Sequence, residues 1–156
     1  MHLNKPYDEI WCVFDRDPAT SNKTGHTAQN FNKAIQLAKK EKIEVAYSNQ
    51  AFEYWLILHF LDHQGGKFPR TEYNTKLNKS LKPFNCKYDG NSSKIVTTEL
   101  FDVLESKEPK TNKIHRDLAI IRAEKIYNRL DHSNPANEES STTIFKLVKR
   151  LLKDYP

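Results

Sequence analysis

The first third of the chain alternates between apolar runs suited to strands and a helical repeat. Residues 9–15 contain the continuous apolar run Ile10 to Phe14, which is typical of a parallel strand covered on both faces. Residues 28–42 place apolar side chains at helical spacing, and Thr27 or Asn30 can cap the predicted helix. Residues 43–47 predict a second strand. A strand, helix and strand in this order indicate a right-handed parallel crossover.

The rest of the chain is predicted to be helical. The segment AFEYWLILHFLDH, residues 51–63, is apolar on almost every side and predicts a buried helix. Further helices are predicted at residues 71–82, 97–106, 114–130 and, after a cap at Thr142 or Thr143, to the C-terminal end. We therefore expect one α/β domain over residues 1–156. A small parallel sheet flanked by helices fills about 8–63, and a mostly helical portion fills about 71–155.

Composition narrows the class of protein only slightly. The net charge of +5 and the pI of about 9.1 suit an anionic partner such as nucleic acid, but also a basic surface that binds nothing. No apolar stretch is long enough to cross a bilayer, and no signal peptide is evident, so we expect no membrane association. Cys12 and Cys86 form no CxxC motif, which favours reduced thiols in the cytoplasm.

The acids that end the first predicted strand are the first candidate site. Asp15 and Asp17 stand two residues apart, so in strand geometry both side chains aim to one side. Ligands of open parallel sheets bind beyond the carboxyl ends of the strands. Oxygen ligands there suit Mg²⁺ or Mn²⁺. The alternative is that Asp15 ends the strand, Asp17 begins a turn and Arg16 neutralises both.

Glu53 is a third acid expected on the same rim of the sheet, because its helix directly follows the second strand. It can serve a metal, or it can close a capping box with Gln50. His59 and His63 are four residues apart but do not form an HExxH motif, so a packed core histidine is favoured over a zinc ligand.

A basic stripe is predicted on the helix at 114–130. His115, Arg122, Lys125 and Arg129 follow one another at steps of seven, three and four residues. Such a stripe could bind phosphates without reading sequence, or it could be an ordinary solvent-facing side. The basic residues between Lys146 and Lys153 leave the same two alternatives.

Four segments resemble, in order, the RloB-like proteins of bacteria and archaea: DEIWCVFDRD, FNKAIQLAKK, EVAYSNQAFEYWLILHF and STTIFKLVKRLL. The resemblance implies a Toprim-like fold. It also implies a metal-dependent nuclease of phage defence or abortive infection, acting on RNA such as tRNA rather than on DNA. Asp15 and Asp17 match the DxD of the Toprim motif, and Glu53 matches the acid of a Phe-Glu pair with a metal or catalytic role. Arg16 and the stripe would position the phosphodiester.

One departure from the Toprim pattern concerns the N-terminal side. Toprim sites also use a glutamate on an earlier strand, whereas only 14 residues precede Asp15 here. We therefore expect a shortened chain, a strand supplied by a partner, or an inactive site. A missing strand leaves an exposed sheet edge, where a partner protein or a second copy could pair. The alternative function is a non-catalytic nucleic-acid-binding or assembly subunit of a defence complex.

Overall fold

Two parallel strands and the helix between them form the α/β unit. The computed structural model describes residues 7–18 and 25–154. Strand β1 (Trp11–Asp15) pairs with β2 (Glu44–Ser48) in a register that sets Asp15 beside Ser48. Helix α1 (Ala28–Lys40) connects them, and its first turn is capped by the Thr27 hydroxyl, which accepts from the Asn30 amide at 3.1 Å. The predicted α/β class and parallel crossover are confirmed.

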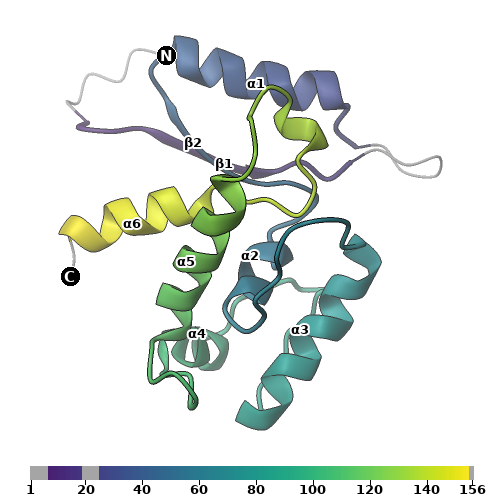
Figure 1. Cartoon of the computed structure of the whole chain (residues 1–156), viewed down its shortest axis with the longest axis vertical. Coiled ribbons are helices and arrows are strands. Elements are labelled where there is room, and N and C mark those ends of the chain that lie inside the picture. Colours follow the sequence, from purple (N-terminus) through teal and green to yellow (C-terminus); the bar gives the residue numbers. More distant parts are fainter. Residues whose placement is uncertain (1–6, 19–24, 155–156) are drawn as a thin grey trace.

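Helix α1 covers one face of the strands with aromatic contacts (Figure 1). The Phe31 ring meets the Tyr47 ring edge to face at a centroid separation of 5.2 Å, and it meets the Phe14 ring at 5.7 Å. Alternate residues of the strands point to this face, which places Phe14 and Tyr47 together. Ala136, in a short 3₁₀ turn (Pro135–Asn137), completes this small cluster.

The larger core lies on the opposite face, where the remaining helices gather (Figure 1). All six residues of α2 (Glu53–Leu58) are buried at its centre. Helix α2 packs against two others, and the mostly helical C-terminal half is confirmed. The helices around it are α3 (Tyr73–Leu81), α4 (Thr98–Glu105), α5 (His115–Tyr127) and α6 (Ile144–Asp154), with 3₁₀ turns at Arg70–Glu72 and Lys82–Phe84.

Helix α2 is much shorter than the apolar pattern predicts. The prediction ran to residue 63, but the helix ends at Leu58. The Arg122 guanidinium donates to the carbonyl oxygens of Leu58 and His59 at 2.8 and 3.0 Å. A cation that satisfies carbonyl groups at the end of a helix also interacts favourably with the helix dipole. A side chain 64 positions away in the sequence therefore caps this end.

The two edges of the sheet differ. Residues 141–143 cover the outer edge of β2: the Thr143 amide donates to the Tyr47 carbonyl at 2.7 Å, and the Asn49 amide donates to the Ser141 carbonyl at 2.9 Å. The Thr143 hydroxyl accepts from the Tyr47 amide. Within the described residues, no strand pairs with the outer edge of β1. Val13 on β1 is 58% exposed.

Cys12 was expected in a buried strand, but it is exposed because β1 lies at the edge of the sheet. Cys12 and Cys86 are both free thiols. In the described part of the chain, none of the helices has the length and apolar character that a membrane crossing requires.

Candidate functional site

Asp15 and Asp17 lie at the carboxyl end of β1 but make different contacts. Asp15 is half-buried, and its Oδ2 accepts from the Phe52 amide at 3.2 Å, just ahead of α2. Asp17 has left the strand, with φ of 41°, and its side chain forms an ion pair with Arg70. The strand alternation that would align the two acids therefore stops at Asp15. The left-handed backbone of Asp17, rather than strand alternation, accompanies its contact with Arg70.

Glu53 is the buried acid of this region. It is the first residue of α2 and only 7% exposed. The Tyr88 hydroxyl donates to Glu53 Oε1 at 3.2 Å. Burial, and then the negative charge of Glu53, raises the pKa of Tyr88, so the hydroxyl keeps its proton and remains a donor. The capping box with Gln50, one of the two alternatives for Glu53, does not form: α2 starts after Phe52 without a side-chain cap, and Gln50 Nε2 instead donates to the Phe68 carbonyl.

Tyr88 reaches Glu53 because asparagines of α3 hold its loop. Asn78 Oδ1 accepts from the Tyr88 amide, and Asn78 Nδ2 donates to the Tyr88 carbonyl, both at 2.9 Å. Asn74 Oδ1 accepts from the Gly90 amide at 3.2 Å. A Cβ on Gly90 would stand 2.8 Å from Asn74 Oδ1, so a side chain at this position would force Asn74 to shift. Sequence reasoning missed Tyr88, although two asparagines four residues apart on a helix were a usable signal.

Asp17 and Glu53 both line one cleft of about 540 Å³ at this end of the sheet. Arg70 and Lys94 line it as well and bring positive charge next to the two acids. Asn74 contributes to the wall. The cleft therefore combines carboxylates, which can hold a cation, with cations, which can hold phosphate oxygens.

The donor chemistry fits a hard divalent cation that keeps part of its water shell. Asp17 and Glu53 supply carboxylate oxygens to the cleft, which Mg²⁺ and Mn²⁺ prefer, whereas Asp15 lines a separate pocket beside α1. Among residues 7–18 and 25–154, no three His, Cys, Asp or Glu side chains are grouped closely enough to hold an ion. Mg²⁺ commonly uses one or two carboxylates and several waters. Glu53 with one of the aspartates is the set that would hold it, and these metal and catalytic roles stay predictions.

Arg16 is not among the residues that line the cleft. Its guanidinium donates to the Ala136 carbonyl and, at 3.4 Å, to Asn49 Oδ1. Its Nε is buried without a partner. These contacts join β1 to the 3₁₀ turn beside α1. Arg70, which the sequence reasoning did not single out, is the arginine that meets Asp17.

The stripe predicted on α5 is not a continuous surface. His115 is 2% exposed, and its Nδ1 donates to the His59 carbonyl at 3.1 Å, so its predicted place on a phosphate-binding face is wrong. Its ring packs between Phe60 and Phe84. The Arg122 guanidinium is occupied by its hydrogen bonds to carbonyl groups at the end of α2. Lys125 and Arg129 are exposed, and their predicted role in nucleic-acid binding stays a prediction.

His59 and His63 have separate structural roles. His59 is 2% exposed and shares a hydrogen bond of 3.0 Å with the Trp55 carbonyl. Burial lowers the pKa of His59 to about 4, so the ring is neutral near pH 7. His63 Nδ1 pairs with the Tyr54 hydroxyl at 2.9 Å. His59 is therefore a packed core histidine, the alternative that the sequence favoured over a zinc ligand.

Comparison with protein families assigns nearly the whole chain. The family model described as RloB-like protein matches residues 2–151. The chain therefore belongs to the RloB-like family, as its sequence resemblance implied. Searches of the curated proteins and of the solved structures found no match.

Proposed function

From this family membership and the cleft, we propose that the protein is a Mg²⁺-dependent nuclease, or part of one. We propose that it acts on RNA, with tRNA as one substrate, in the cytoplasm during phage defence or abortive infection. The observation that carries the proposal is the buried carboxylate of Glu53, which lines the same cleft as Asp17, Arg70 and Lys94. Burying a carboxylate costs desolvation free energy, so a buried acid is most useful where a cation or a proton must be held.

Each group in the cleft has a role in this proposal. A divalent cation, when bound, would lower the pKa of water and neutralise charge on the phosphate. Glu53 would serve as its ligand or accept the proton of the attacking group. Tyr88 would keep one Glu53 oxygen in a fixed direction through its hydrogen bond. Arg70 and Lys94 would hold non-bridging phosphate oxygens.

Substitution of Glu53 tests the proposal directly. We expect Glu53→Gln to lower Mg²⁺-dependent cleavage of tRNA by about 100-fold or more, which is the range for loss of a general base. Asp15→Asn and Asp17→Asn should reduce cleavage as well. Asp102→Asn is the matched control, because this acid is exposed on α4, away from the cleft. Circular dichroism would establish that each variant is folded, and undiminished cleavage by folded Glu53→Gln would exclude the catalytic assignment.

A second candidate is a non-catalytic nucleic-acid-binding or assembly subunit. The ion pair between Asp17 and Arg70 favours it, because this contact neutralises one of the acids that a metal would need. This candidate predicts salt-sensitive RNA binding that is the same in Mg²⁺ and in EDTA, with no turnover. Metal-dependent cleavage by the purified chain would rule it out.

We further propose that a partner protein or a second copy pairs with the outer edge of β1. Unpaired backbone groups along an edge strand favour the addition of another strand. The exposed apolar side chains of Ile10 and Val13 support this, because an added strand would give them cross-strand neighbours.

A further inference from the structure

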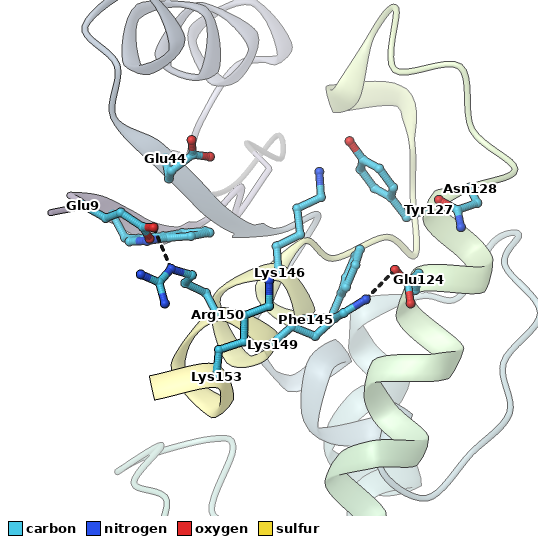
Figure 2. A pocket seen from close by; sticks show the side chains of 11 residues that line it. Glu9, Glu44, Glu124, Tyr127, Asn128, Phe145, Lys146, Lys149, Arg150 and Lys153 are labelled. Atoms are coloured by element: carbon cyan, nitrogen blue, oxygen red, sulfur yellow. Dashed lines mark hydrogen bonds and ion pairs between the residues drawn. The ribbon is translucent and has the colours of Figure 1, made fainter. Parts of the chain in front are cut away.

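A second pocket lies where the strands begin, at the opposite end of the sheet from the acid cleft. It is an open pocket of about 480 Å³, lined by the start of both strands, the end of α5 and one side of α6 (Figure 2). This volume is within the range of small-molecule sites. Five residues of parallel strand separate the two ends of β1, which is about 13 Å of backbone. A ligand in this pocket would therefore not touch Glu53.

Aromatic side chains form much of the pocket wall. Trp11 on β1 is partly exposed, and its Nε1 donates to Glu9 at 3.0 Å. Tyr127 has His132 stacked on its ring at 3.8 Å and the Lys146 ammonium 3.9 Å from its centre. Because Tyr127 is already occupied by these two groups, Trp11 is the ring that is better placed to receive a planar ligand.

Helix α6 contributes four cations, but they are not equivalent. Lys149 pairs with Glu124 at 2.8 Å, and Arg150 pairs with Glu9 at 2.6 Å (Figure 2). Lys146 and Lys153, two turns apart, form no ion pair with a described residue, so the contact of Lys146 with the Tyr127 ring leaves its charge unneutralised. In Figure 2 the Lys146 side chain extends into the space between Glu44 and Tyr127. The positive charge that remains for a ligand is therefore concentrated on two lysines.

Glu44 gives the pocket a hydrogen-bond acceptor on the β2 side. It is exposed at the first position of β2 and forms no ion pair with a described residue. A carboxylate here would repel a simple polyanion but would accept from hydroxyl or amino groups. The pocket thus presents a ring, two cations and an acceptor.

We propose that this pocket binds a nucleotide. The base would lie against Trp11, because stacking on an aromatic ring tolerates any base. Its phosphate would meet the ammonium groups of Lys146 and Lys153, and Glu44 would accept from ribose hydroxyls. A free nucleotide and the terminal nucleotide of a single-stranded RNA share this chemistry. An acidic peptide would use the lysines but neither Trp11 nor Glu44.

Binding of adenosine 5′-monophosphate and of a fluorescein-labelled six-residue oligoadenylate tests the proposal. Calorimetry and fluorescence anisotropy would be run in EDTA, so that the acid cleft holds no metal. We expect Lys146→Met combined with Lys153→Met to weaken binding about 10-fold or more. Lys39→Met combined with Lys40→Met is the matched control, because it removes the same charge from exposed positions of α1. The control should change affinity by less than about 2-fold.

Two substitutions separate the role of Trp11 in nucleotide binding from its role in folding. Trp11→Ala should lose binding, whereas Trp11→Phe, which keeps a ring in the strand, should retain part of it. Equal affinity for both probes supports a free nucleotide, and much tighter binding of the oligonucleotide supports an RNA end. Unsaturable binding of both probes, an equal loss in the α1 control, or inorganic phosphate binding as tightly as the mononucleotide would overturn the proposal. These measurements report binding in EDTA rather than metal-dependent cleavage, so failure here is distinct from failure of the nuclease proposal.

Discussion

The contact between α3 and the Tyr88 loop provides the sharpest test of how the acid cleft is built. Asn78 makes two hydrogen bonds to the Tyr88 backbone, and both have donor–acceptor distances of 2.9 Å. In Asn78→Ala, an amide and a carbonyl lose these partners. At about 1 kcal/mol for each hydrogen bond, the loss is about 2 kcal/mol. The higher helix propensity of alanine offsets roughly 0.5 kcal/mol of this loss of stability. The net destabilisation is therefore about 1.5 kcal/mol.

Thermal or urea denaturation of the purified variant would measure this change. A loss of 1.5 kcal/mol corresponds to a fall in Tm of about 3–6 °C for a chain of this length. Ser80→Ala is the control on the same helix, because its hydroxyl makes only an exposed bond to the Lys76 carbonyl. We expect that control to stay within about 0.5 kcal/mol of the wild type.

A double-mutant cycle connects the same contact to function. Tyr88→Phe removes the hydroxyl that donates to Glu53, whereas Asn78→Ala displaces the loop that carries it. If both act through one hydrogen bond, the effect of Tyr88→Phe on cleavage should be smaller in the Asn78→Ala background. Additive effects on cleavage, or an Asn78→Ala variant as stable as the wild type, would refute the proposed role of α3.

Two further predictions concern a buried histidine and the open sheet edge. The folded pKa of His59, about 4, lies below its ordinary value, so stability is complete above about pH 6.5 and declines as the pH falls toward 4. We expect a loss of roughly 2 kcal/mol at pH 5 relative to pH 8 in chemical denaturation, and His59→Leu should flatten this dependence. Val13→Asp should remove concentration-dependent self-association in analytical ultracentrifugation, with stability within about 0.5 kcal/mol, because Val13 is 58% exposed. Unchanged association in that variant would exclude the β1 edge as the interface.

The strand–helix–strand unit was predictable because its signals are local. The apolar runs of β1 and β2 and the cap at Thr27 act over a few residues, and the structure uses all three. The length of α2 was not predictable in the same way. Its apolar pattern continues past Leu58, but Arg122 from α5 satisfies carbonyl groups at the point where the helix stops. Periodicity reports which side chains can be buried, whereas a distant donor sets the helix end.

The candidate site was predictable only in part, for a related reason. Glu53 follows β2 directly, so topology alone suggested its place at the sheet end. Tyr88 and Arg70 enter the site through loops whose positions depend on tertiary contacts. His115 illustrates the opposite error: counting charges along a helix treats a histidine as exposed, although a neutral imidazole can pack among aromatic rings and bond a carbonyl group.

Arg70 distinguishes the two candidate functions on physical grounds. Its ion pair with Asp17 is partly exposed on both sides, so breaking it in water costs little, about 1 kcal/mol or less. A phosphate group entering the cleft would offer Arg70 a stronger, bidentate partner and would leave Asp17 free for a cation. In a nuclease, RNA binding should therefore increase affinity for Mg²⁺, and Mg²⁺ should increase affinity for RNA by the same factor. A binding subunit has no reason for such coupling, because its ion pair would persist in the complex and EDTA would leave its affinity for RNA unchanged.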